Sequence, residues 1–184
     1  MKLAPLIVAI ILTTVVTLGC TDQPNGGNGG GDGNGTTYAS FTNGEFYVEY
    51  PSDWSVFTEN QDLAGITTEN FLVAEKTGGA GVIVRGHKES QGSALMGFDE
   101  WYDSSLEDYQ NSEDSTVIDY EKSVNEAFIE YTFLSGGAVT VYSKNKFIAC
   151  ADNAFLCISS VENILRSDYQ DQIDHIISSF TCVT

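Results

Sequence analysis

The sequence predicts an α+β domain built on an antiparallel sheet. Its stretches of alternating apolar and polar residues are short and joined by tight turns, and two further stretches carry apolar residues at helical spacing. The order is strands, helix, strands, helix, which is typical of an antiparallel sheet with separate helices. Apolar residues on both faces of the later strands, as at Phe147 and Ile148, predict a covering layer on each face of the sheet.

Alternation and turn residues identify the strands. Residues 45–50 alternate apolar and polar side chains, and an Asn-Gly pair ahead of them predicts a hairpin with residues 38–41. Residues 81–88 are apolar on both faces around Ile83, which predicts a central strand covered on two sides. The remaining predicted strands are residues 71–75, 116–122, 127–134, 139–151 and 154–161, with Asp152-Asn153 as the tip of the last hairpin.

Two segments have the apolar spacing of amphipathic helices. Residues 97–110 and residues 167–180 each place aromatic or aliphatic side chains three and four positions apart. Ser167 and Gln170 have the spacing of a capping box at the start of the second helix. The apolar positions are Phe98, Trp101, Tyr102, Leu106 and Tyr109 in the first segment, and Tyr169, Ile173, Ile176, Ile177 and Phe180 in the second.

The N-terminus indicates export. Lys2 is the only charge before Asp22, and the apolar run between them is typical of a signal peptide over residues 1–19. The run ends in Thr17-Leu18-Gly19-Cys20, which resembles the lipobox of bacterial and archaeal lipoproteins, although Thr17 stands where Leu is usual. The resemblance implies cleavage before Cys20 and lipidation of its thiol. The alternative is an uncleaved membrane helix. Both readings place the rest of the chain outside the cytoplasm, on the outer face of the cell membrane.

A flexible tether follows Cys20. Seven of the ten residues from Gly26 to Gly35 are glycine, so residues 20–37 cannot bury apolar surface. The sixteen residues from Thr21 to Thr36 have an r.m.s. end-to-end distance of about 22 Å, which lifts the folded domain just clear of the lipid surface. Residues 38–184 then form a single domain.

The charge of the chain limits its partners. Eight Lys and Arg against 26 Asp and Glu give a formal net charge of −18. Such a chain repels phosphate backbones and anionic headgroups, so nucleic-acid binding is excluded and membrane attachment must be hydrophobic or covalent.

Two short motifs resemble the PsbP-like family. Tyr50-Pro51-Ser52-Asp53-Trp54 looks like the start of PsbP-like domains, and the closing segment through Ser179 and Phe180 is similar to the end of that family. The resemblance covers about residues 38–180 and extends to DcrB-like and LpqN-like prokaryotic lipoproteins. It implies an α/β/α sandwich around a central antiparallel sheet. It also implies a binding or assembly module and carries over no catalytic residues.

Within the family motif, Tyr50, Pro51 and Trp54 have a structural explanation. Pro51 suits the second position of a type I turn, which would fold Trp54 back over the sheet edge. Trp54 is then either a plug of the core, the interpretation we favour, or part of a binding surface.

The chain lacks the motifs of common enzymes. His87 and His175 are its only histidines, and neither stands in a zinc-binding spacing. There is no nucleophile elbow and no phosphate-binding glycine loop at a strand-to-helix turn. We therefore expect no catalysis and no cofactor. An extracytoplasmic enzyme would need a carboxylate or histidine pair in a cleft.

Acidic side chains gather on the first predicted helix. Asp99, Asp103 and Glu107 lie four residues apart and so share a face. One hypothesis is a weak calcium site with oxygen ligands. The alternative, which the acidity of the whole chain favours, is a solvated acidic surface.

Three cysteines remain after Cys20. The last predicted helix and the strand before it have similar lengths, so Cys182 should return to the tip of the last hairpin, near Cys150. Cys150 and Cys157 would be diagonal neighbours about 7–8 Å apart, which is long for a bridge. We favour a Cys150–Cys182 disulfide, with Cys157 as the alternative partner and three free thiols as the remaining option.

These observations predict a membrane-anchored lipoprotein with a binding or assembly module and a protein partner at the membrane surface. The alternative is a lipoprotein that binds a small solute or a divalent metal ion. Such a protein would hold its ligand on the acidic helix or in a sheet–helix pocket lined by Trp101, Tyr102 or Tyr109.

Overall fold

The computed structural model describes residues 35–57, 61–63, 66–76, 79–87, 97–151 and 153–183. The predicted signal peptide, Cys20 and most of the tether lie outside these residues. The elements in chain order are β1 (Tyr38–Thr42), β2 (Phe46–Pro51), β3 (Ser55–Phe57), β4 (Gln61–Leu63), β5 (Ile66–Lys76), β6 (Ala80–His87), α1 (Phe98–Asn111), β7 (Ser115–Lys122), β8 (Glu126–Ser135), β9 (Val139–Cys150), β10 (Asn153–Glu162), a 3₁₀ turn (Asn163–Leu165), α2 (Arg166–Ser179) and β11 (Thr181–Cys182).

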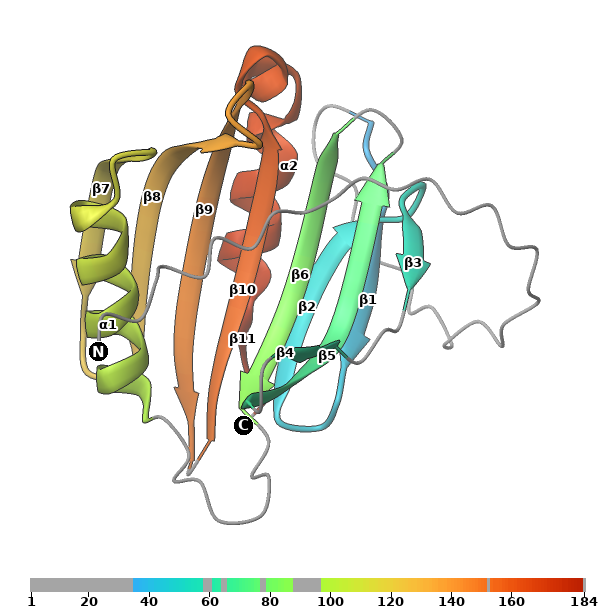
Figure 1. The fold of residues 1–184 in the computed structure, drawn as a ribbon. Coiled ribbons are helices and arrows are strands. Elements are labelled where there is room, and N and C mark those ends of the chain that lie inside the picture. The colour runs from blue at the N-terminus through green and yellow to red at the C-terminus, as the bar shows by residue number, and fades with distance from the viewer. Residues whose placement is uncertain are drawn as a thin grey trace.

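The strands form two antiparallel sheets (Figure 1). The larger sheet has the order β3-β5-β6-β10-β9-β8-β7, with β4 paired to β5, and the smaller has the order β1-β2-β11. All of the pairs are antiparallel, and short connections join most of the pairs that are neighbours in the sequence. The α+β class and the antiparallel sheet predicted from the sequence are therefore confirmed.

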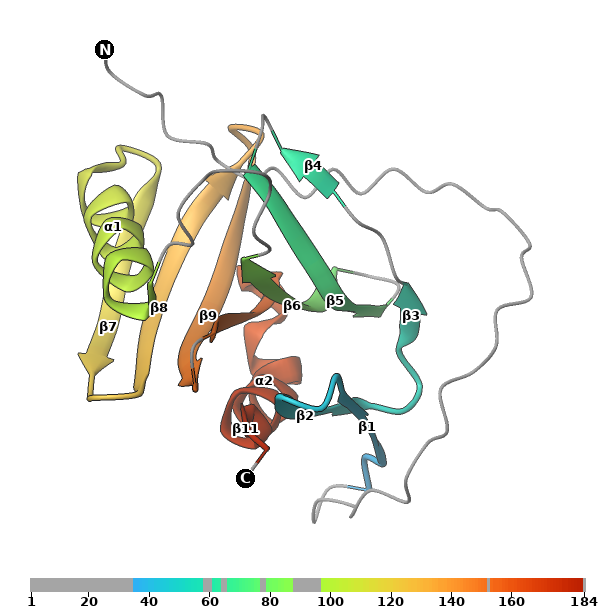
Figure 2. The ribbon, with the colours of Figure 1, turned by 90° about the horizontal axis from the view of Figure 1, so that it is seen from below.

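The larger sheet lies between two layers. Helix α2 and the smaller sheet cover one face, and α1 lies on the other, as the view from below shows (Figure 2). Neither helix of the described chain has the length and apolarity that a bilayer crossing needs.

The main core lies between the larger sheet and α2. The Phe46 ring of β2 is fully buried and packs 5.0 Å from the Phe155 ring and 5.5 Å from the Phe180 ring, measured between centroids. Ile173 and Ile176 of α2 are equally buried, at the positions that the helical spacing predicted. This core fixes the smaller sheet against the larger one.

The second core lies under α1. Trp101 and Tyr102 meet the Phe147 ring edge-on, at centroid distances of 5.9 and 5.6 Å. Phe98 adds a third buried side chain, and the sheet supplies Ala127, Ile129 and Leu156. Because these partners lie mainly on β8 and β9, α1 covers the β7 end of the larger sheet (Figure 1).

Two local predictions were wrong. Cys150 pairs with Asn153, so the hairpin turn begins at Ala151 and not at Asp152-Asn153. The predicted capping box at Ser167 does not form, because the 3₁₀ turn leads directly into α2 at Arg166 and no side chain caps the helix. Gln170 instead accepts a 2.9 Å hydrogen bond from Arg166 Nε. The short strands β3, β4 and β11 were not predicted.

Candidate binding groove

A row of buried polar side chains crosses the larger sheet beneath the last turn of α1. Ser143 and Asn145 of β9 are fully buried, and Ser143 Oγ donates to Asn145 Oδ1 at 3.1 Å. Ser143 Oγ also shares a 2.9 Å hydrogen bond with Ser160 Oγ of β10. The Asn145 amide donates to the Tyr109 hydroxyl at 3.2 Å. These bonds satisfy polar groups that burial would otherwise penalise.

Two tyrosines close this row on the side of α1. The rings of Tyr109 and Tyr131 stack at a centroid distance of 4.0 Å, and the Tyr131 hydroxyl lies 3.5 Å from the Asn145 amide. Burial raises the pKa of Tyr109 well above its ordinary value, and the neighbouring Tyr131 adds to this rise. Tyr109 therefore stays neutral at physiological pH and holds the end of α1 on the sheet.

Beyond this row, the same face of the sheet forms an open groove of about 260 Å³. Its walls are mainly aliphatic, and Gly81 and Ser160 form part of its floor. A Cβ on Gly81 would meet only Ala74 O at 3.5 Å and Glu75 Cβ at 3.9 Å, so the space above it is open. The apolar side chains that line this groove and point to it are Val73, Ile83, Phe133, Val139, Val141 and Ile158.

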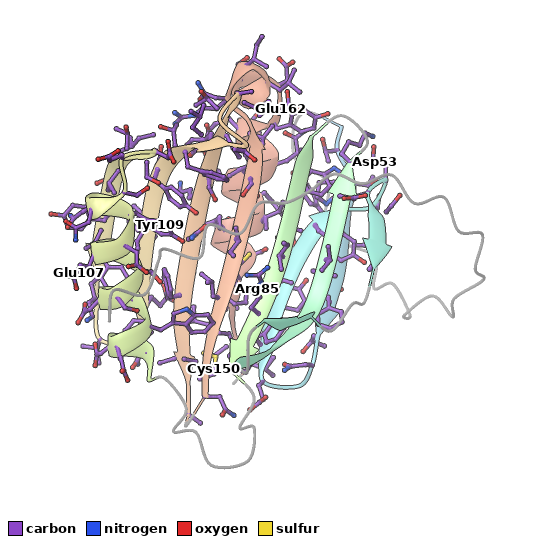
Figure 3. The ribbon with its side chains drawn as sticks, viewed as in Figure 1. Asp53, Arg85, Glu107, Tyr109, Cys150 and Glu162 are labelled. Atoms are coloured by element: carbon purple, nitrogen blue, oxygen red, sulfur yellow. A yellow bond between two sulfur atoms is a disulfide. The ribbon has the colours of Figure 1, made fainter. Side chains whose placement is uncertain are left out.

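Carboxylates supply the charge that faces the groove. Glu75 of β5 and Glu162 of β10 both line it, and neither forms an ion pair within the described chain. Glu162 extends over Gly79, where a Cβ would lie 3.1 Å from Glu162 Cγ. Lys76 also lines the groove, but its ammonium group binds Asp53. Figure 3 shows Glu162 and Asp53 at the same end of the molecule.

A buried arginine lies beyond the other end of the groove. Arg85 of β6 is 8% exposed and follows Ile83 by two residues, so the two side chains share a face. Burial lowers the pKa of Arg85, while the neighbouring Tyr109 and Tyr131 oppose this shift. Arginine still remains protonated, because its ordinary pKa is so high. Arg85 and Tyr109 lie over the same face of the sheet (Figure 3). Arg85 itself does not line the groove, and the carboxylates of the groove lie at its Gly79 end.

The family motif is structural. Tyr50 and Trp54 are 7% and 6% exposed, and Trp54 belongs to the core under α2. The Trp54 amide donates to Pro51 O at 3.1 Å, which closes the predicted turn. Trp54 is thus a core plug and not part of a binding surface.

The acidic face of α1 is neutralised by a lysine. Lys122 Nζ lies 2.8 Å from carboxylate oxygens of both Asp99 and Asp103. Glu107 lies one turn further along and is exposed, and Figure 3 shows it on the outer side of α1. No group of three or more metal-ligating side chains comes together in the described part of the chain. A calcium site at Asp99, Asp103 and Glu107 is therefore unsupported, because Lys122 occupies the place of the cation.

Cys150 and Cys182 form a disulfide, with their Cα atoms 5.5 Å apart. Strand β11 pairs with β2 and brings Cys182 back to the hairpin tip, as the lengths of α2 and β10 led us to expect. Cys157 is free and fully buried. It is not a partner of Cys150, because Cys150 lies opposite Asn153 and Cys157 is four residues, about 13 Å, further along β10.

His175 does not stand alone. Its Nε2 lies 2.6 Å from Glu49 Oε2, and its ring stacks on Tyr38 at a centroid distance of 3.7 Å. The Tyr47 hydroxyl donates to the other Glu49 oxygen at 2.6 Å. This hydrogen bond, and more weakly His175, hold the pKa of Glu49 below its ordinary value against the opposing effect of burial. The pair joins α2 to β2 and does not line the groove. The His87 side chain lies outside the described residues.

The sequence did not predict the groove. Residues on both faces of β6 are apolar, and this predicted a covering layer on each side. Val82 and Val84 do lie in the core under α2, whereas Ile83 lines the groove. The pocket expected at Trp101, Tyr102 or Tyr109 is not this one, since none of the three lines it. The sequence feature that could have indicated the groove is a pair of small residues, Gly81 two positions before Ile83 and Ser160 two positions after Ile158.

Comparison with solved structures shows the fold. The chain is similar to cyanobacterial PsbP (CyanoP) from Synechocystis sp. PCC 6803, with a TM-score of 0.55, 16% identity, and 85% of this chain and 98% of that one covered. It is also similar to LpqN of Mycobacterium tuberculosis, described as involved in cell envelope biogenesis, with a TM-score of 0.48, 7% identity and coverages of 76% and 83%. The likeness to cyanobacterial PsbP confirms the predicted PsbP-like fold, and at 16% identity it shows the fold alone. No family model and no curated protein matches the sequence.

Proposed function

We propose that this protein is a membrane-anchored extracytoplasmic module that binds a partner protein through the groove, without catalysis. The observation that carries the proposal is the groove itself, an apolar hollow on the half of the sheet face that α1 leaves open. Concave, mainly apolar hollows with a few polar groups at their edges are the usual places where proteins bind ligands and partners.

The groove is large enough for side chains of a protein partner. An engineered cavity of about 150 Å³ holds benzene, so about 260 Å³ accommodates one or two large side chains. Its walls come from five neighbouring strands, β5, β6, β10, β9 and β8, which are held in register by the sheet. A preformed surface of this kind loses little conformational entropy on binding.

The anchor positions the groove at the membrane. Lipidation at Cys20, followed by the glycine-rich tether, would hold the domain on the outer face of the membrane while leaving it free to reorient. Intact-mass spectrometry of the protein from its native membrane tests this part. We expect cleavage before Cys20 with an added lipid mass, and a mass that retains residues 1–19 without lipid would contradict lipidation in favour of a membrane helix.

Binding of a small apolar solute is the second candidate, because the groove is more than large enough for a single ring. Native mass spectrometry separates the two candidates. A small molecule that co-purifies in stoichiometric amount would favour the solute, whereas the protein-binding proposal expects none.

Photo-crosslinking tests the proposal in the native membrane. A photoreactive amino acid replaces Ile83 inside the groove or, as a control, Glu107 on the outer side of α1. We expect one discrete protein adduct from position 83 and none of that mass from position 107. Equal yields at both positions, or no adduct from position 83, would overturn a groove-mediated role.

A further inference from the structure

The charge of the groove is concentrated around the first residues of β6. Glu75 lies opposite Gly81 in the β5–β6 pairing, and the Glu162 amide bonds Gly79 O on the other side. The two carboxylates thus flank β6, on strands about 10 Å apart. Neither Gly79, just before β6, nor Gly81 within it carries a side chain, so no side chain fills the space between the two carboxylates at these positions.

These two carboxylates are available to a ligand. Neither takes part in an ion pair or a side-chain hydrogen bond within the described chain. The lysine that also lines the groove binds Asp53 instead. Carboxylates at the edge of an apolar hollow attract a positive group, and solvent screens the half-buried Glu162 less than the exposed Glu75.

The apolar walls of the groove favour an aliphatic side chain in the bound segment. Ile83, Ile158 and Val141 are all partly exposed, so a side chain laid between them would remove their remaining apolar surface from water. A bound segment is therefore oriented, with its positive group at the Gly79 end and its aliphatic group toward Ile83.

We infer that the groove binds a segment of the partner protein in which an aliphatic side chain lies next to a lysine or arginine. This inference rests on the proposed function and specifies the partner's chemistry. Glu75 and Glu162 hold the basic side chain, and the aliphatic walls hold its neighbour. The net charge of −18 also accelerates the encounter with a basic partner.

Synthetic peptides test this inference on the full-length protein in phosphatidylcholine nanodiscs. The probe is acetyl-Lys-Ile-Lys-Val-Lys-amide with a fluorescent label, followed by anisotropy. One matched peptide replaces every Lys by Glu, and another replaces Ile and Val by Ser. We expect binding of the first peptide, with the other two at least about ten-fold weaker. Two lost charge-assisted hydrogen bonds account for this difference in the Glu peptide, and lost burial of apolar surface accounts for it in the Ser peptide.

Paired variants of equal net charge separate local recognition from long-range attraction. We expect Glu75→Gln with Glu162→Gln to weaken the lysine peptide about ten-fold. The control, Glu107→Gln with Glu113→Gln, changes two exposed carboxylates outside the groove and should leave affinity within about two-fold. Thermal melts check that both variants fold, which we expect because none of the four side chains is buried.

Equal weakening by both pairs would overturn the inference, as would equal binding of the lysine and glutamate peptides or no binding of any peptide. The crosslink at position 83 keeps the two proposals distinct. An adduct whose crosslinked segment contains no lysine or arginine would leave the proposed function standing and refute this inference.

Discussion

The Asn145 amide donates to the Tyr109 hydroxyl at 3.2 Å, and this contact fixes where α1 ends on the larger sheet. Tyr109 lies in the last turn of α1, and Asn145 lies at the middle of β9. The neighbouring Ser143 extends the row of hydrogen bonds to Ser160, which lines the groove. The polar row thus forms the boundary between the covered and the open halves of this face.

Loss of Asn145 should destabilise the protein substantially. In Asn145→Ala the buried hydroxyls of Tyr109 and Tyr131 each lose a hydrogen-bond partner, and Ser143 loses an acceptor. We expect a decrease of about 2 to 3 kcal/mol in the free energy of unfolding, measured with urea. The matched control is Tyr120→Phe, since Tyr120 is 52% exposed, and its effect should be within about 0.5 kcal/mol. An equal effect of the two substitutions would contradict the role given to Asn145.

Reduction of the disulfide should also destabilise the fold. Cys150 and Cys182 are 32 residues apart, and opening a loop of this length costs about 3 to 4 kcal/mol in the chain-entropy estimate. We expect dithiothreitol to lower the melting temperature of the wild type but not that of a Cys150→Ser, Cys182→Ser double variant. An equal response of both proteins to the reductant would argue against the bridge.

The hydrogen bonds that Glu49 accepts from Tyr47 and shares with His175 predict a dependence of stability on pH. The pKa of Glu49 is lowered in the folded state, mainly by the hydrogen bond from Tyr47. Its contribution is present above the ordinary value of 4.5 and is lost as the pH falls through the lowered folded value. Between pH 7 and about pH 3 the wild type should lose about 1 kcal/mol more than Glu49→Gln. Parallel losses in urea titrations of the two proteins would refute this.

Lys122 should offset the repulsion between Asp99 and Asp103 on the acidic face of α1. In Lys122→Met, Asp99 and Asp103 lose the ammonium group that lies 2.8 Å from each. We expect a small loss of stability, at most about 1 kcal/mol, that moderate salt reduces.

Calorimetric titration with calcium should give no heat of specific binding in the wild type. A calcium affinity tighter than millimolar would restore the metal hypothesis.

The sequence predicted an element correctly where the buried face of that element alone sets the spacing of its apolar residues. Alternation in residues 45–50 and the spacing of Ile173 and Ile176 predicted β2 and α2, because a buried face imposes its period on the chain. The short strands β3, β4 and β11 span only two or three residues, too few to show a period. They form because longer neighbours offer free edges.

The groove could not be predicted from any one segment. Its walls come from strands that are distant in the sequence. The apolar pattern around Ile83 is the same whether a helix or solvent covers that residue. The position of α1 decides this, and the buried aromatic core under α1 holds that position together with the hydrogen bond between Tyr109 and Asn145. The disulfide, in contrast, could be predicted from the similar lengths of α2 and β10, because these two elements run back along each other.

Filling the groove tests the central claim most directly. Gly81 lies in β6 without a left-handed backbone, so Gly81→Val suits a strand and projects two methyl groups into the open space. After crosslinking in the native membrane, the amount of the partner recovered is compared among wild type, Gly81→Val and Glu107→Gln. The account predicts an unchanged melting temperature and a loss of the partner only in Gly81→Val. Full recovery of the partner with a folded Gly81→Val protein would contradict it.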